Sequence, residues 1–171
     1  MAVKIHLEIV TPEGVKFSED VDEFTAPSVQ GEFGVLPSHR PLLAGLKTGI
    51  VTYSQDGETH AVAIGPGFAR VGENKANIIT DRFISKADVD PVVARKELKE
   101  TQDALDKLDA QSPETEKNEK IGASRWAATR LELYGDPPPA TAILAHEMRL
   151  LAGDDYSDES LAKDSENTEA G

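Results

Sequence analysis

The first half of the chain is built from short apolar runs with a period of two, and this pattern limits the fold more than any other feature. Val3, Ile5, Leu7 and Ile9 alternate with polar residues, as expected for a strand with one buried face. Similar runs occupy 15–17, 21–26, 49–54, 59–64, 67–71 and 76–80, and turn sequences at Asp56-Gly57 and 72–75 separate some of them. Many short strands without a helical period between them predict an antiparallel sandwich or barrel.

The pattern becomes helical after Ser85. Asp90 followed by Pro91 is typical of a helix start, and apolar or small residues then recur at helical spacing up to Leu108. Ser112 and Pro113 repeat the start signal and predict a second helix that ends at Gly135. Two helices with a short connection predict an antiparallel hairpin.

The last part of the chain, 136–171, is expected to be an extension of two kinds. Ala140, Ile143, Leu144, Met148 and Leu151 have the spacing of a short third helix closed by Gly153. The remainder is acidic and has few large apolar side chains, so it is expected to be disordered. The predicted domains are therefore a β-sandwich over 1–84, a two-helix hairpin over 85–135 and this extension.

Composition excludes several function classes. The chain has 18 basic and 31 acidic residues and a formal net charge of −13, which argues against a nucleic-acid partner. It has no cysteine, which excludes disulfides and thiolate metal sites and fits a reducing compartment. Neither a signal peptide nor a membrane-spanning run is expected from the sequence, so any membrane contact would be made through a partner.

No set of residues in the sequence points to catalysis or to a cofactor. The histidines His6, His39, His60 and His146 are scattered, without the spacing of metal ligands. The segment from Gly65 to Arg70 lacks the third glycine of a dinucleotide-binding loop, and no phosphate-binding loop is present. We therefore expect no catalytic residue, no metal site and no cofactor.

The segment 31–43, G-E-F-G-V-L-P-S-H-R-P-L-L, has two glycines and two prolines and predicts a shaped loop rather than a periodic element. Two interpretations of it remain open. In the first, its glycines make turns, its apolar residues fill the core, and His39 and Arg40 project into water. In the second, a rigid loop presents Glu32 and His39 to another protein.

This segment, followed by L-K-T-G at 46–49, resembles the signature of the ATP synthase epsilon subunit family, and the resemblance extends over residues 3 to about 134. The resemblance implies a non-catalytic subunit with a sandwich of ten strands that binds the gamma subunit and stands on the ring of c subunits. It assigns these contacts to Glu32, Phe33, Gly34, His39 and Arg40. Glu32 would face the c ring, and His39 would lie near gamma.

The resemblance also implies that the helical hairpin is mobile and inhibits ATP hydrolysis. Four cations of the second helix, Lys117, Lys120, Arg125 and Arg130, can meet acidic alpha and beta catalytic subunits, or can equally serve only as solubilising charge. The implied location is peripheral, at the cytoplasmic face of a bacterial inner membrane or its organellar equivalent, with the driving ion, proton or sodium, left open.

Some bacterial relatives bind ATP through a motif similar to I/L-D-x-x-R-A at the first helix. Here Asp90 is present, but Val93 occupies the arginine position and Arg95 comes two residues later, about 200° around the helix. Weak or absent ATP binding is therefore expected. The alternative functions are a stand-alone nucleotide-sensing or protein-binding module and a small enzyme on a sandwich scaffold.

Overall fold

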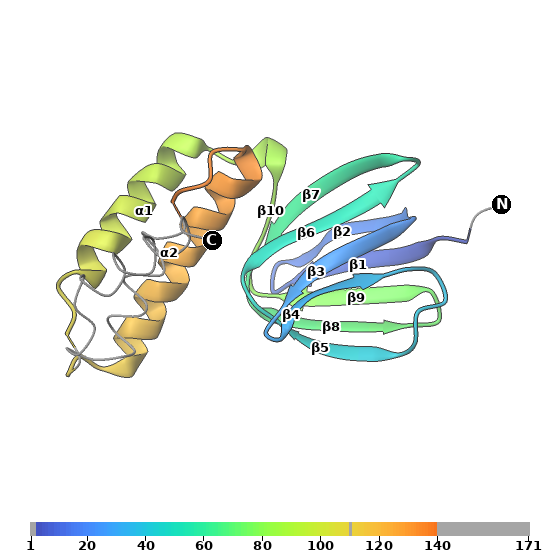
Figure 1. Ribbon diagram of the computed structural model, residues 1–171, viewed down its shortest axis with the longest axis horizontal. Helices are drawn as coiled ribbons and strands as arrows, with labels where there is room; N and C mark the ends of the chain where they lie inside the picture. The colour runs from blue at the N-terminus through green and yellow to red at the C-terminus, as the bar shows by residue number, and fades with distance from the viewer. Residues whose placement is uncertain (1–2, 110, 140–171) are drawn as a thin grey trace, which may run out of the picture.

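The computed structural model describes residues 3–109 and 111–139, and it consists of ten strands followed by two long helices (Figure 1). The predicted third helix and acidic tail lie outside the described residues. The strands are β1 (Ile5–Thr11), β2 (Gly14–Val21), β3 (Glu23–Ser28), β4 (Gly31–Val35), β5 (Leu42–Leu46), β6 (Gly49–Gln55), β7 (Glu58–Ile64), β8 (Gly67–Gly72), β9 (Lys75–Thr80) and β10 (Phe83–Ser85).

The strands form one sheet that folds over into two layers. The order is β10-β7-β6-β3-β5-β8-β9-β1-β2, with β4 paired to β3 outside this path, and every pairing is antiparallel except that of β1 with β9. The core between the layers contains the inward residues of most strands, among them Ile5, Leu7, Ile9, Phe24 and Ile78. The prediction of an antiparallel sandwich is confirmed.

The two predicted hairpin turns are also present. Asp56 and Gly57, between β6 and β7, both have positive φ angles, as do Glu73 and Asn74 between β8 and β9. A pair of positive φ angles matches the right-handed twist of the flanking strands.

The helical hairpin consists of α1 (Pro91–Leu105) and α2 (Glu114–Tyr134). Ala94 and Leu98 of α1 pack against Ala127, Ala128 and Leu131 of α2 and form an apolar seam between the helices. Asp90 caps α1 as predicted, because its Oδ1 accepts hydrogen bonds from the backbone nitrogens of Val92 and Val93 at 2.9 and 3.2 Å.

The sequence predicts the C-terminal end of α2 correctly but not its N-terminal cap. Gly135 ends the helix in the left-handed region, with φ of 109°, as predicted. The predicted cap at Ser112 is wrong, because Pro113 occupies the N-cap position without a side-chain cap. The Ser112 hydroxyl instead donates to Asp109 Oδ1 at 3.0 Å, so it stabilises the connection between the helices.

The hairpin lies beside the sandwich with α2 nearer to it (Figure 1). Leu133 of α2 is buried together with Ala63 of β7 and Val89, which precedes α1. Four partly buried residues complete this junction cluster: Ile50, Ala61, Ile84 and Trp126. The cluster is separate from the sandwich core, so the two parts of the chain have distinct cores and a small shared contact.

Candidate partner-binding surface

The outer face of the β5-β8-β9-β1 layer carries a row of apolar side chains that crosses neighbouring strands. Phe68 of β8 pairs with Ile79 of β9, and Ile79 pairs with Val10 of β1. Val10 in turn pairs with Val15 of β2. Paired residues share one face of a sheet, so these four side chains form a line, which we call the outer apolar row.

Three of the four side chains of this row, those of Val15, Phe68 and Ile79, are exposed although they are large, and Val10 is half-buried. Phe68 and Ile79 expose 61% and 60% of their surface. Their immediate neighbours in sequence, Ala69 and Ile78, point to the other face and are almost completely buried. Alternation along the strands therefore places apolar side chains on both faces of this layer, and the outer set has no partner within the described part of the chain.

The apolar surface continues beyond the row at the β3–β4 turn. Val29 is 69% exposed, and its backbone nitrogen donates to the carbonyl oxygen of Gly45 at 3.0 Å. Gly45 pairs with Phe68, so Val29 lies next to one end of the row. Leu43, two residues before Gly45, is 74% exposed.

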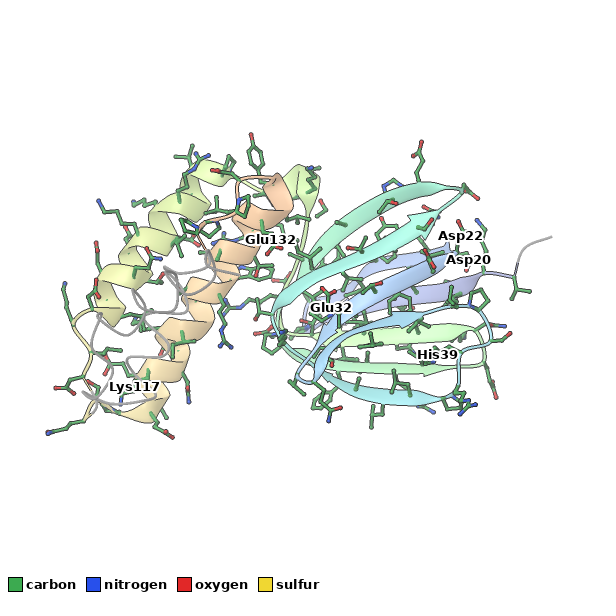
Figure 2. The ribbon with its side chains drawn as sticks, in the orientation of Figure 1. Asp20, Asp22, Glu32, His39, Lys117 and Glu132 are labelled. Carbon is green, nitrogen blue, oxygen red and sulfur yellow. The ribbon has the colours of Figure 1, made fainter. Side chains whose placement is uncertain are left out.

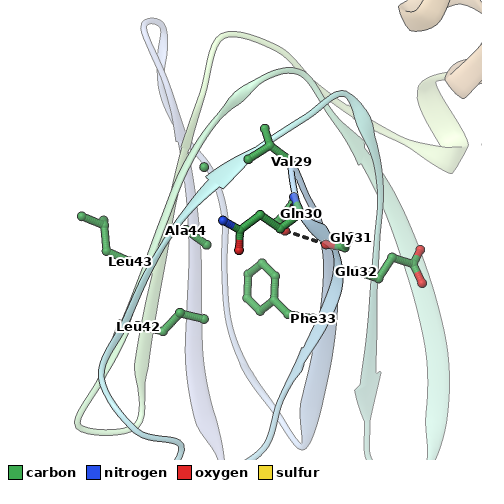
Figure 3. Close-up of a pocket in the computed structure, with 10 residues that line it drawn as sticks. Val29, Gln30, Gly31, Glu32, Phe33, Leu42, Leu43 and Ala44 are labelled. Carbon is green, nitrogen blue, oxygen red and sulfur yellow. Dashed lines mark hydrogen bonds between the residues drawn. The ribbon is translucent and has the colours of Figure 1, made fainter.

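The β3–β4 turn is rigid and presents Glu32. Gly31 has a φ of +119°, a conformation that favours glycine. The Ser28 hydroxyl donates to the Gly31 carbonyl oxygen at 2.6 Å and accepts from the Gln30 nitrogen at 3.1 Å. A cavity of about 320 Å³ lies between this turn and β5. Glu32 and Phe33 both line the cavity, but the exposed carboxylate of Glu32 points away from it (Figure 3).

Gly34 is the only other residue of β4 assigned to a partner contact. It pairs with Thr25 of β3, and a Cβ atom there would lie 3.8 Å from the Thr25 hydroxyl, an ordinary contact distance. The structure therefore gives no steric reason for glycine at this position.

His39 and Arg40 lie in the connection between β4 and β5. Figure 2 shows His39 away from Glu32. The His39 nitrogen donates to the Leu36 carbonyl at 3.1 Å, and its Nδ1 donates to the Arg40 carbonyl at 2.7 Å. Ser38 has a φ of 63°, and its nitrogen donates to Asn74 Oδ1 at 2.7 Å.

The prediction of one shaped loop over 31–43 is wrong. Residues 31–35 form β4 and residues 42–46 form β5, so only the connection 36–41 lies outside the strands. The alternative in which a single loop presents both Glu32 and His39 fails for the same reason, because Glu32 belongs to β4 and His39 to the connection that follows it. The interpretation in which the apolar residues of 31–43 fill the core holds only in part. Val35 is buried in the core, whereas Leu43 is exposed.

The four cations that the family resemblance assigns to α2 differ in exposure. Arg125 is exposed, Lys120 is half-buried and Lys117 is buried. The Arg130 side chain is only 12% exposed. Arg130 forms an ion pair with Glu97 of α1, and its guanidinium carbon lies 5.9 Å from the centre of the Trp126 ring. Arg130 therefore connects the two helices in this arrangement.

The two residues assigned to nucleotide binding are not brought together. The carboxylate of Asp90 is the cap of α1. The Arg95 guanidinium donates twice to Asp136 Oδ2, from Nε at 3.0 Å and from Nη2 at 2.6 Å. Each side chain therefore holds one end of a helix.

The sequence analysis did not predict one set of hydrogen-bonded polar side chains, those of Ser18, His6 and Asp20. His6 Nδ1 lies 2.8 Å from Asp20 Oδ1, and the Ser18 hydroxyl lies 3.2 Å from His6 Nε2. Serine, histidine and aspartate in this order resemble a hydrolase triad, but the Asp20 side chain is 67% exposed and all three residues lie on the open surface of β1 and β2. Triad chemistry requires donors for an oxyanion in a site that excludes water. Residues 3–109 and 111–139 also contain no group of three metal-ligating side chains.

Comparison with known proteins agrees with the family resemblance. Residues 4–86 match the family model described as the ATP synthase delta/epsilon chain, beta-sandwich domain. An ATP synthase epsilon chain of Nitratidesulfovibrio vulgaris is 45% identical over 96 residues, which cover 56% of this chain and 72% of that relative. One of Anaeromyxobacter dehalogenans is 38% identical over 133 residues, which cover 75% of this chain and 96% of that relative.

A solved structure has a similar fold. A chain in the Euglena gracilis mitochondrial ATP synthase, in the OSCP/F1/c-ring assembly in rotational state 1, aligns with a TM-score of 0.55 at 23% identity over 78% of each chain. In the described part of the present chain, neither helix is long and apolar enough to pass through a lipid bilayer.

Proposed function

The chain belongs to the ATP synthase epsilon chain family, and on this basis we propose that it couples the gamma subunit to the c ring and regulates ATP hydrolysis. As an epsilon chain it is a non-catalytic subunit of the ATP synthase complex. Binding is assigned to the sandwich, 1–84, and regulation to the hairpin, 85–135. The proposed location of this subunit is peripheral, as part of the ATP synthase, at the cytoplasmic face of a bacterial inner membrane or its organellar equivalent.

The main support for gamma-subunit binding by the sandwich is the outer apolar row, whose side chains are largely exposed. Full burial of one large aliphatic or aromatic side chain contributes about 1.5 to 3 kcal/mol. Phe68 and Ile79 are adjacent and more than half exposed, so a complementary apolar surface gains most of this amount from each of them. An aromatic side chain at the centre of such a surface is a common binding hot spot. The proposed partner on this face is therefore an apolar surface of gamma.

The proposed contact with the c ring is made by the β3–β4 turn. Glu32 is exposed in β4, directly after the turn, and the Ser28 hydrogen bonds together with Gly31 fix the turn that precedes it. A single carboxylate on a rigid turn selects the register of a polar or basic partner loop more than it adds affinity. Val29, in the turn that precedes Glu32, lies next to the row, so the two proposed contacts are close to one another.

The proposed regulation depends on movement of the hairpin. Arg125 lies on the exposed surface of α2. Arg130 is held by Glu97 of α1, so it becomes available only when α1 and α2 separate. A hairpin that is docked by a small cluster and has an alternative binding surface is a suitable two-state element.

The test for gamma binding is an affinity measurement with the purified gamma subunit. Phe68→Glu places a charge in the outer apolar row and is expected to weaken binding about 100-fold, as for loss of an interface hot spot. Val3→Glu is the matched control, because Val3 is an exposed valine (56%) that precedes β1 and lies outside the row. Equal affinity of the Phe68→Glu variant and the native chain would exclude this face as the gamma site.

A further inference from the structure

The strand β5 has an open edge beside the β3–β4 turn. It pairs with β8 along its whole length, but with β3 only through Leu46. The Gly45 carbonyl oxygen accepts from the Val29 nitrogen and therefore points away from β8. In an antiparallel ladder both backbone groups of a residue point to one side, and every second residue points the same way. The N–H and C=O groups of Leu43 therefore also point away from β8, and no described residue is hydrogen-bonded to them.

The other edge strands of the described sheet carry features that block the addition of a further strand, whereas β5 does not. β2 ends the strand order and exposes Lys16, Glu19 and Asp20. β10, at the other end, has only three residues, and β4 carries Glu32. The sequence of β5, L-L-A-G-L, has no charge and no proline. Because charged side chains and short strands are the usual protection of a free edge, β5 is the edge best suited to accept another strand.

The cavity of about 320 Å³ between β5 and the β3–β4 turn lies beside this edge (Figure 3). Its apolar lining is accessible, because Phe33 and Leu42 are only half-buried and Val29 and Leu43 are 69% and 74% exposed. Every second side chain of an added strand points to the same side. A strand along β5 would therefore find unpaired backbone groups and an apolar space for one of its side chains.

We propose that an extended segment of the gamma subunit adds to the edge of β5 as a strand and places an apolar side chain in this cavity. The inference rests on the proposed function, since gamma is the proposed partner of the outer apolar row. Gly45 pairs with Phe68 of that row, and Leu43 is exposed on the same face of β5. A surface of gamma that covers Phe68 therefore reaches β5 without a break. In this mode of binding the backbone hydrogen bonds contribute affinity and the pocket selects the side chain.

The first test is residue-resolved hydrogen exchange of the full chain, alone and with the purified gamma subunit. In the free chain we expect the amide of Leu43 to exchange at least tenfold faster than that of Ala44, which faces β8. In the complex, the exchange of the Leu43 and Gly45 amides should slow at least tenfold. The amides of the edge strand β2 serve as the control and should not show this protection along the strand edge.

The second test compares the affinities of two variants for the gamma subunit. Leu43→Pro removes the N–H group that points away from β8, and proline is tolerated at such a position of an edge strand. Leu43→Ala is the matched control, because it also removes the leucine side chain but keeps the N–H group. We expect Leu43→Pro to bind gamma about tenfold more weakly than Leu43→Ala, as for the loss of one backbone hydrogen bond and of the close approach of the two strands.

The two tests separate this inference from the proposed gamma site. If gamma bound the native chain but left the exchange of the Leu43 and Gly45 amides unchanged, strand addition would be wrong, and the outer apolar row would still be judged by the Phe68→Glu variant. Equal affinities of correctly folded Leu43→Pro and Leu43→Ala variants would also contradict it. If Leu43→Pro did not fold, the exchange measurement on the native chain would decide. Absence of any gamma binding would overturn both this inference and the proposed site.

Discussion

Leu133→Ala is expected to loosen the hairpin from the sandwich without unfolding either part. Leu133 is 4% exposed and is the large aliphatic residue that α2 buries in the junction cluster. Leucine-to-alanine substitution in a packed core costs about 2 to 5 kcal/mol. The neighbours Ile50, Ile84 and Trp126 are only partly buried and can collapse into the space, so we expect the lower limit, about 2 kcal/mol.

The assay is tryptophan fluorescence during urea denaturation. Trp126 is the only tryptophan of the chain and belongs to the junction cluster. A loss of 2 kcal/mol reduces the docking equilibrium constant about 30-fold. Because the junction is a small contact, we use a urea slope of about 1 kcal/mol/M, so the change in Trp126 emission should occur about 2 M earlier than in the native chain. The helical circular dichroism should persist beyond this change, because the α1–α2 seam is intact.

Leu105→Ala is the control for this experiment. Leu105 is 1% exposed and packs against Ile121 and Leu108 at the other end of the hairpin. Its loss weakens the hairpin itself, so emission and helical signal should change together. If the Leu133→Ala variant followed the native emission curve, or lost emission and helix at the same urea concentration, the junction would not be a separate contact.

Three further predictions concern other parts of the chain. Ser38→Gly should raise the free energy of unfolding by about 0.5 kcal/mol in thermal denaturation. Ser38 has a left-handed backbone conformation, which is about 1 to 2 kcal/mol less favourable for a residue with a side chain than for glycine. Part of this gain is lost, because glycine has more conformational entropy in the unfolded chain. Burial raises the pKa of Tyr53, so the folded state disfavours its phenolate. Its contribution to stability is complete below pH 10 and is lost as the pH rises further, so Tyr53→Phe should flatten this loss in denaturation experiments over that range. Calorimetry of the isolated chain with ATP should show no saturable binding in the micromolar range, because Asp90 and Arg95 are engaged at helix ends, and tight binding would contradict this.

Local patterns predicted those elements whose signal lies within a few neighbouring residues. The alternation in β1 follows directly from burial, since Ile5, Leu7 and Ile9 are within 1% of full burial. The turn at Asp56-Gly57 and the end of α2 at Gly135 depend on backbone angles that few residues adopt. In each case the residue itself carries the structural requirement.

The strands β4 and β5 could not be predicted in this way. Their sequences contain Gly31, Gly34 and Gly45, and glycine weakens a strand pattern. They form strands because β3 and β8 provide pairing partners, which lie apart from them in the sequence or across a turn. Tertiary pairing overrides a weak local preference here.

The outer apolar row was missed for a related reason. Phe68 and Ile79 are each followed or preceded by a buried apolar residue. From its sequence alone, each strand therefore has the continuous apolar pattern of a strand buried on both faces. Only the register shows that the two residues are paired and lie on the exposed face. The family signature pointed to the β3–β4 turn instead, which lies at one end of this surface. Ser38 was similarly hidden, since its positive φ angle follows from the connection between two strands that were not predicted.

The distribution of contacts also sets the order in which the hairpin can respond. The junction buries one large aliphatic side chain of α2, Leu133, together with part of Trp126. The seam between the helices buries five residues and is reinforced by the Arg130–Glu97 ion pair. The junction is therefore the weaker boundary, and the hairpin should detach as a unit before its helices separate. A complete shift between two states requires about 5.5 kcal/mol of differential binding. Arg130 could contribute to a proposed contact with a catalytic subunit only after the second step, because Glu97 holds it while the two helices are packed together.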